Sequence, residues 1–195
     1  DPTEPRLTGE LKIPGYSAYL HPMDHNHLLA IGMNGDDEGR LHGLAVKIFD
    51  VADLENPALL HDYVLESPGN DWSWSEALAD HHAFTFRNDV LSLPAVQGSW
   101  SGNLFAGLLL LSVDLDDGID ELGRVNHDDL PTESSGDWSW SALVRRSLFI
   151  EDNVYSLSRR GMKVNNLYDP EIEYAAVPFD DPEPEVSPLA IDRPR

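Results

Sequence analysis

A chain of 195 residues can bury a substantial core and is typical of one or two domains. Its 35 acidic residues against 13 basic ones give a formal net charge of −22, a field that opposes binding to nucleic acid or to an anionic membrane. Cysteine is missing, which excludes disulfide and thiolate chemistry, and the longest apolar run, 104–113, is shorter than the roughly 20 residues that span a bilayer as a helix.

The first 66 residues predict the end of one β-sheet unit and then a complete one. Residues 7–13 alternate like a short strand and follow an acidic, proline-containing turn, as the strand expected at 59–65 does. We therefore interpret 1–13 as the end of a preceding unit, so that the chain starts in the middle of a repeat. The complete unit is a four-stranded antiparallel meander over 16–66, with strands at 17–20, 27–32, 44–49 and 59–65.

Two further units follow, at 76–128 and 142–179. In the former, strands at 83–86 and 90–96 form a hairpin around Asn88 and Asp89, residue types that tolerate left-handed backbone. A nearly all-apolar strand at 105–113 and a closing strand at 122–126 complete it. In the latter, strands are expected at 147–150, 154–157, 161–165 and 173–177. Residues 180–195 are acidic and rich in proline, which predicts a disordered tail.

Internal repeats support these units. The motif Asp-Trp-Ser-Trp-Ser at 71–75 returns at 137–141, residues 86–93 read like 150–157, and 26–31 is a weaker copy of the same hairpin. No long stretch has the apolar spacing of a helix. The sequence predicts an all-β fold, a β-propeller segment of about three four-stranded antiparallel blades spanning 1–179. Since propellers close with about 4–8 blades, the ring is incomplete, and further blades from the parent chain or from another copy are expected to cover its open faces.

Several short stretches resemble a bacterial and archaeal family of secreted proteins with a C-terminal β-propeller domain, distantly related to WD40 repeats. The matching stretches are 9–16, 19–22, 26–28, 48–51 with 56–57, 75–78 with 80–81, 146–150 and, in the closing blade, 163–167. The resemblance covers about 1–179 and lacks the family's long N-terminal part with its early blades. It implies a propeller fold and a location that is secreted or in the cell envelope or periplasm, and it implies no particular reaction.

Five residues are candidates for a metal site: His21, Asp24, His27, His81 and His82. Imidazole and carboxylate groups suit zinc and other divalent ions. Their spacing matches no defined site, however, and a histidine at a strand-joining turn commonly serves as a hydrogen-bonding group that holds the turn. We favour the structural role and keep the metal site as the alternative.

Four tryptophans, Trp72, Trp74, Trp138 and Trp140, form a candidate ligand-binding set. Exposed tryptophan beside serine and aspartate suits a carbohydrate or peptide site, because it buries much apolar area at a low entropic cost. The alternative, which we favour, is that they wedge between adjacent blades. The acidic stretches 114–121 and 34–38 could bind calcium through oxygen ligands, but neither has the spacing of an EF-hand, so a solvated turn is the simpler interpretation and no cofactor is expected.

The function that these features favour is a non-enzymatic scaffold or a module that binds an unidentified protein or glycan. The alternatives are a hydrolase or lyase with its histidine and aspartate residues around the central channel, and a tryptophan-lined carbohydrate-binding module, since propellers host both enzymes and binders. No catalytic residue can be assigned. The pairs Arg145-Arg146 and Arg159-Arg160 form a basic spot too small for nucleic acid, and neither nucleic-acid binding nor membrane insertion is expected.

Overall fold

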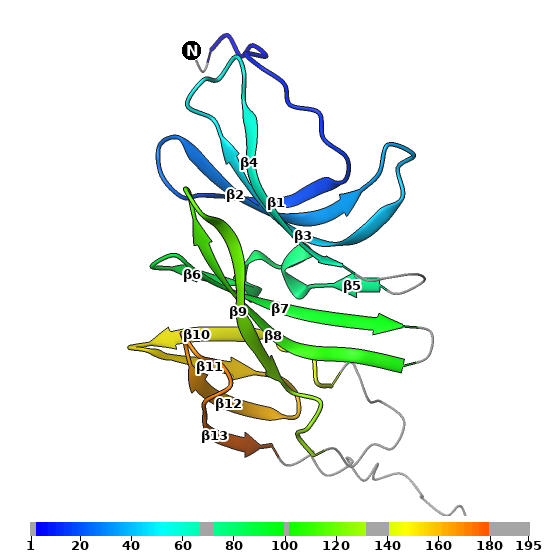
Figure 1. Ribbon diagram of the computed structural model, residues 1–195, viewed down its shortest axis with the longest axis vertical. Coiled ribbons are helices and arrows are strands. Elements are labelled where there is room, and N and C mark those ends of the chain that lie inside the picture. Colours follow the sequence, from blue (N-terminus) through cyan, green and yellow to red (C-terminus); the bar gives the residue numbers. More distant parts are fainter. Residues whose placement is uncertain (1–2, 67–71, 100–101, 132–140, 180–195) are drawn as a thin grey trace, which may run out of the picture.

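The computed structural model describes residues 3–66, 72–99, 102–131 and 141–179, and these fold into three antiparallel sheets stacked along the long axis of the molecule (Figure 1). Blade 1 has the order β1 (Tyr16–Pro22), β2 (His27–Gly35), β3 (Leu41–Asp50), β4 (Ala58–Glu66). Blade 2 has the order β5 (Trp72–Trp74), β7 (Val90–Ser99), β8 (Gly102–Asp114), β9 (Gly118–Asn126), and β6 (Thr85–Arg87) also pairs with β7. Blade 3 has the order β10 (Arg146–Ile150), β11 (Asn153–Leu157), β12 (Gly161–Asn166), β13 (Glu173–Pro178). The predicted all-β propeller segment of three meanders is confirmed.

The first strand of blade 2 is divided, which the sequence interpretation missed. β5 pairs with one end of β7 and β6 with the other. Between them lie two 3-10 turns, η1 (Glu76–Leu78) and η2 (His81–Ala83). Ser75 and Asp80 cap these turns, because their side chains accept hydrogen bonds from the backbone N–H groups of Ala77 and His82. The hairpin expected at 83–86 and 90–96 is therefore present with a shorter first strand. No helix in the described ranges has the length and apolar character needed to cross a bilayer.

The prediction of a strand at 7–13 is wrong. This stretch runs as an extended segment that pairs with no strand in the described part of the chain. Gly9 lies against the backbone of Leu54 and Glu55, in the loop before β4, and the segment then passes over blade 1 to reach β1 (Figure 1). An alternating sequence becomes a strand only when it pairs with a sheet edge, and within the described residues 7–13 pairs with none. The predicted tail, 180–195, lies outside the described residues.

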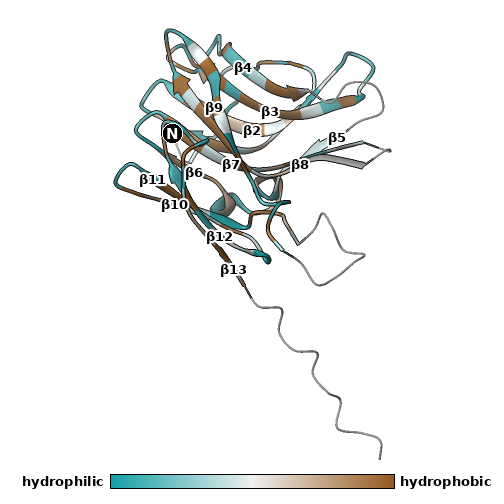
Figure 2. Cartoon of the chain, turned by 60° about the horizontal axis from the view of Figure 1, so that its bottom comes forward, coloured by the Kyte–Doolittle hydropathy of each residue, from teal (hydrophilic) through white to brown (hydrophobic). Residues whose placement is uncertain are grey.

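Buried apolar clusters bind the blades to one another. Between blades 1 and 2, Leu29, Ile31 and Ile48 pack against Leu93 and Leu109 with all five side chains fully buried. Between blades 2 and 3, blade 2 presents Leu108 and Leu110, and blade 3 presents Phe149 and Val154. Figure 2 shows apolar stretches, in brown, on strands of all three sheets. Because each inner sheet face is covered by the next sheet, hydrophobic burial stabilises the stack.

Equivalent backbone hydrogen bonds fix how the three blades correspond. The bonds from Val51 to Asn26, from Val113 to Asp89 and from Leu167 to Asp152 measure 2.7, 2.8 and 2.9 Å, and each joins the third strand of a blade to the start of its second. Asn26, Asp89 and Asp152 are therefore equivalent, and so are Leu28, Leu91 and Val154. Aligning 86–93 with 150–157, as the sequence suggests, is wrong by one residue, and such a slip assigns every side chain to the opposite face of the sheet.

Candidate functional site at the inner strands

The first strands of the three blades lie side by side, at the edge that would line the channel of a propeller. β1 contacts η1, and both η2 and β6 contact β10. An aromatic cluster joins blades 1 and 2 at this edge. His21 meets the rings of Phe84 and Phe86 edge-on, each at 5.8 Å between centroids. Tyr19 stacks on His81 at 5.3 Å with the ring planes 12° apart.

Beside this cluster, Asp80 organises the turn η2. Its Oδ1 accepts the backbone N–H of His82 at 3.0 Å and lies 3.1 Å from Nδ1 of the same residue. Its Oδ2 accepts a hydrogen bond from Arg146 of blade 3 at 2.7 Å. The pKa of Asp80 is lowered, mainly by the backbone hydrogen bond from His82, so the carboxylate is charged at neutral pH. The His81 and His82 rings lie 3.9 Å apart, and both residues are exposed.

The five residues predicted as a metal set are divided among separate places. His21 belongs to the aromatic cluster, whereas Asp24 and His27 face each other in the turn between β1 and β2, with His27 Nδ1 2.9 Å from Asp24 Oδ2. This side-chain hydrogen bond is the main cause of the lowered pKa of Asp24, and the backbone N–H groups of Asn26 and His27, which donate to the same carboxylate, lower that pKa further. Within the described ranges, Asp80, His81 and His82 are the one group of three whose ligand atoms all lie within 4.8 Å of one another. Sequence reasoning had left Asp80 out of this group.

The described copy of the repeated tryptophan motif takes part in contacts between blades. Trp74 packs against Ala142 and Leu143, the residues that directly follow the second copy of the motif. Ser73 Oγ accepts the N–H of Leu44 at 2.7 Å and donates to the carbonyl of Leu65 at 3.0 Å, so it links β5 to blade 1. Trp72 keeps 40% of its surface exposed. Trp138 and Trp140 lie outside the described residues.

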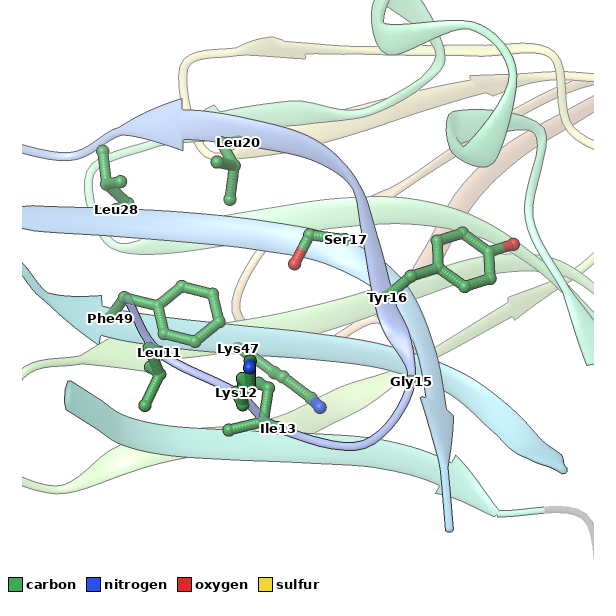
Figure 3. Close-up of a pocket in the computed structure, with 10 residues that line it drawn as sticks. All are labelled: Leu11, Lys12, Ile13, Gly15, Tyr16, Ser17, Leu20, Leu28, Lys47 and Phe49. Carbon is green, nitrogen blue, oxygen red and sulfur yellow. The ribbon is translucent and has the colours of Figure 1, made fainter. Parts of the chain in front are cut away.

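A cavity of about 600 Å³ lies between the N-terminal segment and the open face of blade 1, the face turned away from blade 2 (Figure 3). Its walls include Ile13 on the segment and Leu20, Leu28 and Phe49 on the sheet. Lys47 projects into the same space, and its Nζ lies 3.4 Å from both the Pro14 carbonyl and Asn34 Oδ1. Burial lowers the pKa of Lys47, and the charge of Asp62 only partly opposes this.

A second, smaller cavity of about 350 Å³ collects carboxylates from three turns of blades 1 and 2. The residues are Asp24, Asp89, Asp114 and Asp116. Asp114 accepts backbone N–H groups of Asp117 and Asp116, which lowers its pKa. The other acidic loop differs, because its Asp36 already bonds to Arg40 and His42. Calcium binding by these loops stays a prediction.

Sequence reasoning missed a buried histidine between blades 2 and 3. His127 directly follows β9 and is fully buried, with Nε2 2.7 Å from Ser156 Oγ and Nδ1 2.9 Å from Ser158 Oγ. Burial, and secondarily the charge of Lys163, lowers the pKa of His127 to about 4, so the ring is neutral at pH 7. The available signal was its position at the end of the predicted closing strand. Its hydrogen-bonding partners, Ser156 and Ser158, lie about thirty residues further along the chain, and no pattern in the sequence links them to His127.

The arginines of the basic spot noted in the sequence form two kinds of contact, ion pairs between blades and buried hydrogen bonds. Arg145 pairs with Glu76 at 2.6 Å and Arg146 with Asp80 at 2.7 Å, so two ion pairs tie the start of blade 3 to the inner turns of blade 2. Arg160 is buried, and its guanidinium donates to Ser141 Oγ and to the carbonyl of Asp128. These contacts explain Arg145, Arg146 and Arg160 as structural groups.

Stacked four-stranded meanders whose first strands meet along one edge define a β-propeller type of protein. The family model for the β-propeller domain matches residues 1–169, and the chain belongs to that family. It is 43% identical over 97 residues to an uncharacterized protein of Methanocaldococcus jannaschii, a match that covers 49% of this chain and 14% of the relative. It is 36% identical over 113 residues to an uncharacterized protein of Archaeoglobus fulgidus, covering 57% of this chain and 16% of the relative. The matched region is thus roughly a seventh of the length of these curated relatives.

Proposed function

We propose that this chain is a non-enzymatic scaffold segment of a larger β-propeller and that its two end faces bind further blades. The open face of blade 1 carries the proposal. Leu28 on this face is equivalent to Leu91, which packs against blade 1, and to Val154, which packs against blade 2. A face that serves as an interface in two blades is expected to serve as one in the third. The cavity beside Lys47 is then space that a preceding blade would fill.

The opposite end of the stack supports the same interpretation. Leu148 and Tyr155 are cross-strand partners on the face of blade 3 that is turned away from blade 2, as are Met162 and Val177. Leu148 is 42% exposed and Val177 is 45% exposed. Grouped apolar side chains on a sheet face are typical of an interaction surface. The greater length of the relatives supports blades from the parent chain as the first candidates, with another copy of the chain as the alternative.

The binding role and the location belong to the same proposal. A closed ring built on this stack would present its loops and channel to an unidentified protein or glycan, and among the described residues Trp72 is the exposed tryptophan available for such contact. The resemblance to secreted proteins supports a location outside the cytoplasm. The proposal assigns no catalytic residue.

Association of the purified chain tests the open faces. We expect it to self-associate and to bind a hydrophobic dye at physiological salt, where screening reduces repulsion between copies. Leu20→Lys on blade 1 and Leu148→Lys on blade 3 should each weaken both effects, since a charge on an apolar interface opposes burial. Leu54→Lys is the matched control, because Leu54 is 65% exposed in the loop between β3 and β4. A monomer by light scattering that binds no dye would contradict the proposal.

A further inference from the structure

We propose that Asp80, His81 and His82 form a binding site for a divalent transition metal ion, with zinc as the test ion. The inference goes beyond the scaffold role and does not depend on ring closure. Each residue offers one ligand atom, and the three atoms lie within 4.8 Å of one another at the inner edge of the stack. Two imidazoles and one carboxylate are a ligand set that zinc accepts in proteins, and such three-ligand sites keep a fourth position open.

The distances suit a small ion. Zinc binds nitrogen and oxygen at about 2.0–2.2 Å, so two ligands of one tetrahedral ion lie roughly 3.3 Å apart. His82 Nδ1 and Asp80 Oδ1 are already 3.1 Å apart, and an ion could take the place of the hydrogen between them. His81 needs to approach by no more than about 1.5 Å to satisfy the same geometry, because no two ligand atoms of the group lie more than 4.8 Å apart. A small torsional adjustment of this exposed side chain, within its present rotamer, can supply that movement.

Groups from all three blades orient these ligands. Arg146 of blade 3 holds Asp80 Oδ2, which leaves Oδ1 for the ion. Tyr19 of blade 1 stacks on the His81 ring. The backbone N–H of His82 in blade 2 donates to Asp80 Oδ1 and so fixes the orientation of this side chain. Such supporting contacts are typical of metal ligands, and their loss usually weakens binding about 10–100-fold.

Two other histidine–carboxylate pairs lack the third ligand that distinguishes the proposed site. His27 pairs with Asp24 at 2.9 Å and His42 pairs with Asp36 at 2.8 Å. Within the described residues, neither pair has a third donor close enough to complete a metal-binding group. They therefore serve as controls of the same chemical type in the same chain.

Zinc titration of the tag-free, chelator-treated chain tests the proposal by calorimetry. We expect one ion per chain and a rise in the melting temperature, because a ligand that binds only the folded state stabilises it. His81→Ala and His82→Ala should each weaken binding by about tenfold or more. His42→Ala should leave the dissociation constant within about twofold, since His42 contributes no ligand.

A loss of zinc binding in these variants can be distinguished from a loss of folding. The His82 side chain is 72% exposed, so the metal-free variant is expected to melt as the unsubstituted chain does. Absence of saturable zinc binding would overturn the proposal. So would binding that survives both His81→Ala and His82→Ala but is lost in His27→Ala, because the ion would then sit in the turn between β1 and β2.

Discussion

The interface between blades 1 and 2 and the interface between blades 2 and 3 use the same positions of the repeat for different chemistry. Blade 2 presents Leu93 and its cross-strand partner Leu109 to blade 1. At the equivalent positions blade 3 presents Ser156 and Lys163 to blade 2. Leu109 is buried among apolar side chains, whereas Lys163 bonds to Asp129 at 2.7 Å and to Glu173 at 2.9 Å. Burial opposes the charge of Lys163, but these two bonds outweigh it and raise its pKa.

Lys47 extends the comparison to the open face of blade 1, because it pairs across β2 and β3 with Ala30 as Lys163 pairs with Ser156. Its Nζ finds one carbonyl and one amide oxygen, each at 3.4 Å, and burial lowers its pKa. The same side chain at the same position therefore gains stability from its charge only where carboxylates bond to it, Asp129 from the neighbouring blade and Glu173 from its own. One repeat framework thus carries an apolar interface, a second interface that adds polar and charged groups to its apolar cluster, and an open face.

The largest expected effect comes from placing the charged side chain of the second interface at the equivalent, apolar position of the first. Leu109→Lys places a charge at a fully buried site among apolar side chains and should destabilise the fold by about 4 kcal/mol or more. Leu109→Met, which keeps the volume, should cost less than about 1.5 kcal/mol. Denaturant unfolding measures both.

The reverse exchange is the matched control. Lys163→Met leaves behind Asp129 and Glu173, whose side chains are 58% and 40% exposed and can be solvated, so its cost should be about 1 kcal/mol. Equal losses in Leu109→Lys and Lys163→Met would show that the two interfaces do not differ in kind.

The second effect is a pH dependence that arises from His127 at the interface between blades 2 and 3. The folded chain holds the pKa of His127 at about 4, below the ordinary value of 6.5 expected when the chain is unfolded. Above pH 6.5 the ring is neutral in both states and the interface keeps its full stability. As the pH falls towards 4 the unfolded state takes up a proton that the folded state rejects, which removes about 3 kcal/mol. Unfolding curves recorded from pH 7 to 4 measure this loss.

His127→Gln separates this effect from the titration of carboxylates elsewhere. It removes the titrating group and keeps a polar side chain near Ser156 and Ser158. The variant should be less stable at pH 7, yet its stability should fall less steeply between pH 6.5 and 4. The same slope in both proteins would contradict the assignment.

Local signals in the sequence predicted the sheets, and long-range contacts account for what it missed. The turn at Asn88 and Asp89 was predicted from residue type, and both residues have positive φ, 50° and 61°. The apolar stretch 105–113 became β8, since a strand covered on both faces is apolar throughout. By contrast, the 7–13 segment depended on a sheet edge that local sequence does not reveal.

The candidate site was predicted less completely. The pair His81 and His82 was identified by residue type, but Asp80 joins it only because Arg146 and the cap of η2 orient the carboxylate. His127 gains its role from serines of another blade. Pattern reasoning finds groups that are adjacent along the chain, whereas packing between blades decides which of them meet.

A third, smaller effect tests the contact between the tryptophan motif and blade 1. Ser73→Ala removes the acceptor for the N–H of Leu44 and the donor to the carbonyl of Leu65, in a buried place. Leaving a buried N–H unpaired should cost about 2 kcal/mol. Hydrogen exchange at Leu44 should quicken, and Ser73→Thr, which keeps the hydroxyl, should recover part of the loss. An unchanged melting curve for Ser73→Ala would show that the link does not stabilise the first interface.

The smallest expected effect concerns the polar side chains Tyr63, Glu121 and Arg124 at the margin of the interface between blades 1 and 2. The Tyr63 hydroxyl of blade 1 donates to Glu121 of blade 2 at 2.8 Å, while Arg124 donates to the same carboxylate at 2.6 and 2.9 Å. Tyr63→Phe removes one bond but leaves Glu121 paired with Arg124, so it should cost about 1 kcal/mol or less. Tyr16→Phe, at a residue that is 51% exposed, is the control and should stay within about 0.5 kcal/mol. A loss as large as that of Ser73→Ala would mean that this margin, rather than the buried leucines, sets the strength of the first interface.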